Sequence, residues 1–177
     1  MNTIKTTDNT SKEYLNEIIN ILIQIRKLQS KPHAQLKPIY QFCRIMMLIG
    51  TPFLILFLTF GIKDRNTVFM MLSTILAVCL LTIGSALLSM RKLRNHMTIN
   101  AGESILIIDT DWVESQSSNG QTTRLAWNQI AYIRVFEHSV CFIPRSLTGF
   151  LINIDKSYAD EIIQAIQAEA PDTNVIR

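Results

Sequence analysis

Two uncharged stretches decide the fold of this chain: IMMLIGTPFLILFLTFGI at residues 45–62 and VFMMLSTILAVCLLTIGSALLSM at residues 68–90. Neither contains Asp, Glu, Lys, Arg or His. At about 1.5 Å per helical residue they would be roughly 27 Å and roughly 35 Å long, which brackets the hydrocarbon core of a bilayer. We therefore predict a transmembrane helical hairpin over residues 44–90.

The rest of the chain is short and close to neutral. Of 177 residues, about 80 follow the hairpin, enough for one small domain. The net charge of +3 is too small for a broad basic surface, so we expect no nucleic-acid partner. We divide the chain into a tail and amphipathic helix (residues 1–43), the hairpin (44–90), a C-terminal domain (96–170) and a tail (171–177).

Basic residues flank the hairpin rather than its loop, which holds only Lys63 and Arg65. The eight flanking residues are Arg26, Lys27, Lys31, Lys37, Arg44, Arg91, Lys92 and Arg94. The positive-inside bias then predicts that both termini are cytoplasmic. Arg91, Lys92 and Arg94 are also candidate contacts for anionic lipid headgroups, although the topology bias alone accounts for them. The first apolar stretch begins beyond residue 40 without a cleavage site and is expected to act as an uncleaved signal anchor.

The segment ahead of the hairpin predicts one amphipathic helix. Residues 1–10 are polar and are expected to be frayed. Thr10 and Glu13 have capping-box spacing, apolar residues then recur at helical intervals, and Pro32 ends the pattern. Such a helix could pack on the rest of the protein, lie in the membrane interface or pair with a second copy, and the sequence leaves these alternatives open.

Within the hairpin, small residues recur four apart in the second stretch, at Ser73 and Ala77 and at Ser85 and Ser89. This spacing allows close approach of a neighbouring helix; the first stretch is the natural partner, and a homo-oligomer stays open. Transporters and channels usually need an ionisable residue within the membrane. A hairpin without one therefore argues against either activity.

From residue 97 onward the apolar pattern changes to alternation. It predicts strands at 97–100, 104–109, 112–117, 121–126, 132–136, 140–143 and 150–154, with a tight turn at Asn119-Gly120. A last amphipathic helix begins at Ser157 and ends before Pro171. The predicted fold class is a membrane α hairpin plus α+β, with an antiparallel bent sheet or small barrel closed by the C-terminal helix.

The C-terminal domain resembles the YcxB-like family of bacterial membrane proteins. The resemblance rests on the turn at 118–120, the tryptophan-x-x-isoleucine link of Trp127 and Ile130, the isoleucine-proline-basic step at 143–145, and Phe150. It departs from the family pattern where residues 146–149 separate Pro144 from Phe150. The resemblance covers roughly residues 40–170 and implies a small pleckstrin-homology-like domain behind two spans, a bacterial inner membrane, and no enzyme activity. From the residues alone, Trp127, Ile130 and Pro144 are packing and strand-ending positions that define the fold.

We find no catalytic, cofactor-binding or metal-binding pattern. His33, His96 and His138 have no ligand spacing, and His138 beside Glu137 is expected in an exposed turn. Asp109 and Asp111 flank a turn, where aspartate favours local backbone hydrogen bonds. The three cysteines, Cys43, Cys79 and Cys141, have no metal or redox spacing and are expected to be free.

These observations favour a non-enzymatic, multi-pass protein whose cytoplasmic domain binds membrane lipids or an unknown protein partner near the bilayer. Two alternatives stay open. The small size and lack of catalytic residues would also suit an immunity or accessory factor that protects the membrane against a toxin. A membrane-tethered enzyme would have to use His138, Glu137 or Asp109.

Overall fold

The computed structural model describes residues 1–99, 101–146 and 151–177. It divides into two compact units, one made of Met1–Leu36 and Arg94–Arg177, the other of Lys37–Leu93. We call the first unit the head and the second the hairpin. Because the hairpin separates the two segments of the head, the folded domain includes chain from before the first apolar helix as well as after the second.

The hairpin consists of α2 (Ile39–Lys63) and most of α3 (Thr67–Ile99), both long and apolar enough to cross a membrane. Both predicted apolar stretches are confirmed as helices. The strand predicted at 97–100 is wrong, because α3 continues to Ile99 and residue 100 lies outside the described part of the chain. Between Met90 and Ile99 no Gly or Pro interrupts the chain, so a continuing helix needs no break.

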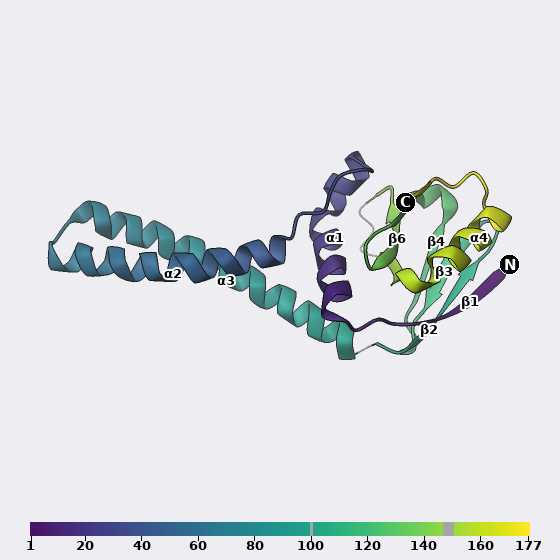
Figure 1. Cartoon of the computed structure of the whole chain (residues 1–177), viewed down its shortest axis with the longest axis horizontal. Coiled ribbons are helices and arrows are strands. Elements are labelled where there is room, and N and C mark those ends of the chain that lie inside the picture. The colour runs from purple at the N-terminus through teal and green to yellow at the C-terminus, as the bar shows by residue number, and fades with distance from the viewer. Residues whose placement is uncertain (100, 147–150) are drawn as a thin grey trace. The chain divides into compact units, whose positions relative to one another are not determined.

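The two helices lie side by side within the hairpin (Figure 1). Glycines allow the close approach: a Cβ atom at Gly50 would lie 2.7 Å from Cδ2 of Leu80, and one at Gly61 would lie 2.9 Å from Sδ of Met70. Phe69 of α3 also packs against the Phe57 ring, with ring centroids 6.0 Å apart. α2 is thus a packing partner of α3, and the glycines at the contact belong to the first apolar stretch rather than to the small residues predicted to pack in the second.

The first sheet of the head has the order β1-β2-β3-β4, with antiparallel pairs. Its strands are β1 (Asn2–Thr7), β2 (Glu103–Ile108), β3 (Trp112–Gln116) and β4 (Thr122–Ala126). The expectation of a frayed N-terminus is wrong. Asn2 pairs with Ile108 and Ile4 with Leu106, and Ile4 is buried in the core. A single buried apolar residue in a polar segment gives too weak an alternation to predict a strand.

The second sheet has the order β7-β6-β5-β8 and is mixed. Its strands are β5 (Ile130–Val135), β6 (Ser139–Pro144), β7 (Ile152–Asp155) and β8 (Val175–Ile176). β8 runs parallel to β5, so part of the predicted C-terminal tail is a strand and the wholly antiparallel arrangement is wrong at this edge. Phe150, which carries part of the family resemblance and begins the last predicted strand, lies outside the described residues.

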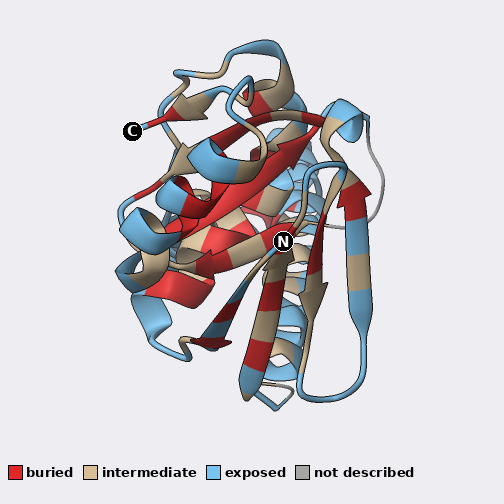
Figure 2. Ribbon diagram, turned by 90° about the vertical axis from the view of Figure 1, so that its right-hand side faces the viewer, coloured by how far each residue is buried: buried red, intermediate tan, exposed pale blue. Residues whose placement is uncertain are grey.

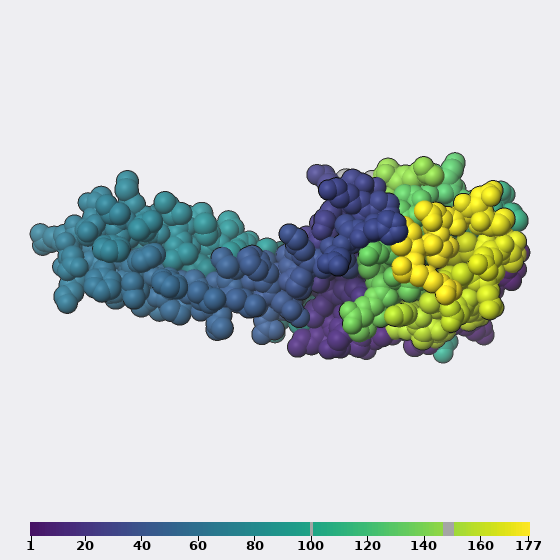
Figure 3. Space-filling view, turned by 45° about the horizontal axis from the view of Figure 1, so that its top comes forward, coloured from purple at the N-terminus to yellow at the C-terminus, as the bar shows by residue number. Residues whose placement is uncertain are grey.

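The last helix is confirmed as α4 (Ala159–Glu169), preceded by a short 3-10 turn, η2, at Lys156–Tyr158. Another 3-10 turn, η1 (Trp127–Gln129), links the two sheets. One apolar cluster joins Leu106 and Val113 of the first sheet, Phe142 of the second and Ile162 of α4. Figure 2 shows buried positions, in red, on strands and helices of the head, and Figure 3 shows α4 and the following segment, in yellow, on its surface. The α+β class is confirmed.

The N-terminal amphipathic helix is α1 (Lys12–Ser30). Its cap is Ser11 rather than Thr10, because the Ser11 hydroxyl accepts the Tyr14 N–H at 3.3 Å. Leu15 and Ile18 join a second apolar cluster with Tyr132 and Ile143 of the second sheet, and α1 packs against β6. Of the three arrangements that the sequence left open, the structure shows this helix packed on the head.

Candidate functional site

The three fold-defining residues lie where the sheets meet or end. The Trp127 indole N–H donates to the Asp109 carbonyl at 2.8 Å, and the ring packs against the main core. Ile130 is buried at the start of β5, opposite Pro144 at the end of β6. The Pro144 carbonyl accepts Nε2 of Gln29 from α1 at 2.8 Å. All three contacts hold elements of the head together.

The predicted headgroup contacts lie on α3, directly after its apolar stretch. Arg91 and Lys92 are exposed, whereas Arg94 is partly buried. Their closeness in one helical turn follows from the sequence alone.

A polar cleft of about 260 Å³ opens at one end of the head. The cleft forms because the inward-facing residues of the first sheet change from apolar to polar along β3 and β4. On β3 the inward residues pass from Val113 to Ser115, and on β4 from Leu125 to Thr123, with Val113 and Leu125 in the core. The hydroxyl and amide groups that line this end belong to Ser104, Ser115, Ser117, Asn119, Gln121 and Thr123.

Part of the cleft wall is fixed by hydrogen bonds. The Tyr14 hydroxyl of α1 accepts Nδ2 of Asn153 at 2.8 Å, and burial raises the pKa of this phenol far above its usual value. The Asp8 carboxylate accepts the Gly102 N–H and the Ser104 hydroxyl, both at 3.2 Å.

Other groups of the cleft remain available to a ligand. Among the described residues, the hydroxyls of Ser115, Ser117 and Thr123 have no side-chain hydrogen bond to the protein. They belong to two adjacent strands joined by the turn at Gly120, whose positive φ of 81° suits a tight hairpin. The cleft can therefore offer several hydroxyl donors and acceptors to an uncharged polar group.

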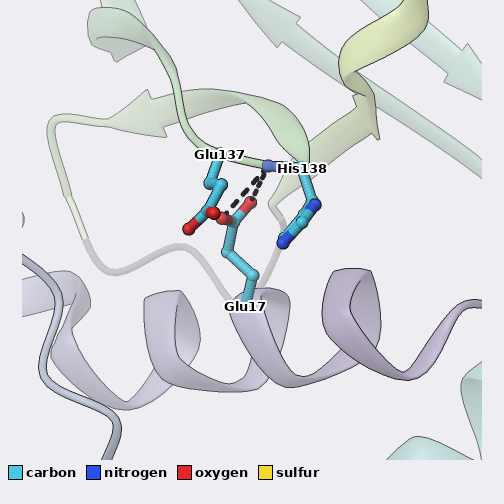
Figure 4. Close-up of side chains that lie close together, drawn as sticks. All are labelled: Glu17, Glu137 and His138. Atoms are coloured by element: carbon cyan, nitrogen blue, oxygen red, sulfur yellow. Dashed lines mark hydrogen bonds between the residues drawn. The ribbon is translucent and has the colours of Figure 1, made fainter.

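A second constellation joins α1 to the turn between β5 and β6. Ligand atoms of Glu17, Glu137 and His138 all lie within 4.8 Å of one another, and we call these residues the Glu-Glu-His cluster. The Glu17 carboxylate accepts the His138 backbone N–H at 3.1 and 3.2 Å and the Ser139 hydroxyl at 2.6 Å. Figure 4 shows the Glu137 and His138 side chains on either side of this carboxylate.

Sequence reasoning found neither constellation. The Glu-Glu-His cluster joins residues about 120 positions apart and depends on how α1 docks, which the sequence left open. The sequence does contain a signal of the cleft, because alternate residues of β3 change from valine to serine. That signal needs the register of the sheet before it can be interpreted.

Comparison of the chain with protein-family models, curated proteins and solved structures gives no match.

Proposed function

We propose that this protein is a non-enzymatic binding protein of a bacterial inner membrane, whose head binds a protein or lipid partner near the bilayer. The observation that carries the proposal is the hydroxyl-lined cleft, in a domain interrupted by two helices of membrane-spanning character. We further propose kinship with the YcxB-like family. A four-stranded sheet, three further antiparallel strands and a closing helix support a pleckstrin-homology-like head.

The pairing of β1 with β2 supports a multi-pass topology with both termini on one side. These strands come before and after the hairpin, yet they form one antiparallel pair from Asn2 and Ile108 to Thr7 and Glu103. A folded head therefore requires both ends of the hairpin on the same face of the membrane. The excess of basic residues outside the loop supports a cytoplasmic location of that face.

The chemistry of the cleft favours an uncharged polar partner group over a phosphate. Among the described residues that line it there is no Lys or Arg, and the lining holds one carboxylate, Asp8, for its one imidazole, His96. Phosphate recognition normally uses basic side chains or a helix N-terminus. A peptide segment offers amide donors and acceptors that suit the available hydroxyls, while Arg91 and Lys92 can attract anionic headgroups outside the cleft.

Single-cysteine labelling tests the proposal, with reporters at Thr67, Thr122 and Thr123. Cys43 and Cys79 are replaced by serine. Cys141 stays, because it is fully buried and burial raises the pKa of its thiol to about 12. Thr123 lines the cleft, whereas its neighbour Thr122 is exposed and points to the other side of β4, so it is a matched control.

We expect an impermeant maleimide to label only Thr67 in intact cells. In opened native membranes, the labelling rate at Thr123 relative to Thr122 should be lower than in the purified protein, because a partner occupies the cleft. Reconstitution with extracted lipids distinguishes the partners: restored protection indicates a lipid, and continued labelling indicates a protein. Equal relative rates in membranes and in purified protein would overturn the binding role of the cleft, and labelling of Thr122 in intact cells would overturn the topology.

A further inference from the structure

The Glu-Glu-His cluster places two carboxylates close together, with a histidine but no Lys or Arg beside them. Ligand oxygens of Glu17 and Glu137 lie within 4.8 Å of each other. Among the described residues, neither glutamate has a Lys, Arg or N-terminal amine within 4.0 Å. Two like charges at this distance repel, and the repulsion is stronger at a partly buried site than in bulk water. Among the described residues, the His138 imidazole is therefore the one basic group beside these two carboxylates.

The Glu17 carboxylate is held in one orientation by the turn that it faces. It accepts the His138 backbone N–H and the hydroxyl of Ser139, a fully buried residue. Such outer hydrogen bonds are the usual means by which a protein orients a metal-binding carboxylate. The Glu17 carboxylate, supplied by α1, therefore has a fixed orientation in the site.

The side chains of Glu137 and His138 are not held by hydrogen bonds to described residues and have room to rotate toward an ion. Glu137 is exposed and His138 is half-buried, and no side-chain hydrogen bond among the described residues restrains either. Tetrahedral coordination at about 2.0–2.2 Å brings ligand atoms roughly 3.4 Å apart. The ligand atoms lie within 4.8 Å of one another, and rotation of the Glu137 and His138 side chains can bring them to that shorter spacing. Because the site is open to solvent, water can occupy the fourth coordination position.

We propose that Glu17, Glu137 and His138 bind a divalent first-row transition metal, with Zn²⁺ as the probe. One imidazole nitrogen and two carboxylate oxygens suit such an ion, whereas Mg²⁺ and Ca²⁺ prefer oxygen ligands throughout. The bound ion joins α1 to the turn between β5 and β6. This role is independent of the polar cleft and of its partner.

The test uses the full chain, purified in detergent without a histidine tag, and titrated with Zn²⁺ or Mg²⁺. We expect one Zn²⁺ per chain, no comparable effect of Mg²⁺, and a rise in the thermal midpoint of unfolding on Zn²⁺ addition. H138Q and E137Q should each weaken Zn²⁺ binding by about tenfold or more. Loss of a residue that only hydrogen-bonds to a metal ligand already costs about tenfold, and loss of a ligand itself should cost at least as much.

Two matched control variants test whether Zn²⁺ binding depends on the Glu-Glu-His cluster rather than on any histidine or glutamate of the head. His33 is an exposed histidine of the head, and Glu13 lies one turn before Glu17 on the same face of α1. H33Q and E13Q should bind Zn²⁺ as the unchanged protein does. The proposal is overturned if no stoichiometric Zn²⁺ binds, or if H138Q, with an unchanged thermal midpoint in chelator, binds Zn²⁺ as well as H33Q does.

Discussion

The head and the hairpin bury opposite kinds of residue. The head core consists of large apolar side chains such as Phe142, Ile133 and Leu106, all fully buried. In α2 and α3 the buried residues are Gly61, Ser73 and Leu80, whereas most of the large apolar side chains are exposed. Apart from Met1 and Ile23, every exposed large apolar residue of the described chain lies within residues 42–99. The head therefore hides its apolar side chains from water, whereas the hairpin leaves them on the surface of two helices long and apolar enough to cross a membrane.

The largest effect should come from placing a charge on the lipid-facing side. Leu81 of α3 is 73% exposed, and Ile23 of α1 is 43% exposed. If the hairpin spans a bilayer, Leu81→Lys should cost roughly 3–4 kcal/mol of insertion free energy, because lysine is strongly disfavoured at the centre of a span. Insertion is measured as the share of newly made chain that resists alkaline extraction from membranes.

Ile23→Lys is the matched control for this prediction. It puts the same charge on an exposed apolar site of the head, where water already surrounds the position, so the cost should stay within about 0.5 kcal/mol. Equal insertion of both variants would mean that water, not lipid, covers Leu81, and the contrast between the two units would disappear.

A second prediction tests whether the head includes chain from before the hairpin. Ile4 of β1 is 3% exposed and belongs to the main core. Ile4→Ala should destabilise the head by about 2 kcal/mol, the lower end of the usual range, because β1 is an edge strand. Unfolding by denaturant is followed by tryptophan fluorescence, which reports the head alone because Trp112 and Trp127 both lie in it.

Lys5→Ala tests the same strand on its outward side. Lys5 is exposed, so the free energy of unfolding should change by no more than about 0.5 kcal/mol. If Ile4→Ala were as mild as Lys5→Ala, β1 would contribute little to the stability of the head, and α1 would be the main element that joins it from before the hairpin.

The sequence predicts local features of this fold well and distant ones poorly. Residues 45–62 and 68–90 fall wholly within α2 and α3, because apolar length is a property of each segment by itself. Most of β2 to β7 was also predicted from alternation. β1 was missed because it has a single apolar residue, and β8 because it has two residues in all. Each takes its stability from a partner elsewhere in the chain, as Asn2 does from Ile108. The Glu-Glu-His cluster was missed for the same reason.

The smallest predicted effect is a pH dependence confined to the head, since residues 45–62 and 68–90 contain no Asp, Glu or His. Glu114 of β3 accepts hydrogen bonds from Gln116 at 2.6 Å and Arg124 at 2.5 Å, and Arg124 lies over the Trp112 ring. These contacts hold the pKa of Glu114 below its usual value of 4.5. Their stabilisation is therefore present above pH 4.5 and lost as the pH falls through the lower, folded-state pKa.

The loss should be about 1 kcal/mol or less, because the Arg124 side chain is 59% exposed and solvent screens the pair. Tryptophan fluorescence gives the free energy of unfolding at pH 7 and at pH 3. The difference between these values should be smaller in Glu114→Gln, which cannot titrate, than in the unchanged protein. Glu103→Gln, at an exposed carboxylate of β2, should keep the full pH dependence. If Glu103→Gln removed as much of it as Glu114→Gln, acid sensitivity would reflect the overall charge of the head rather than this ion pair.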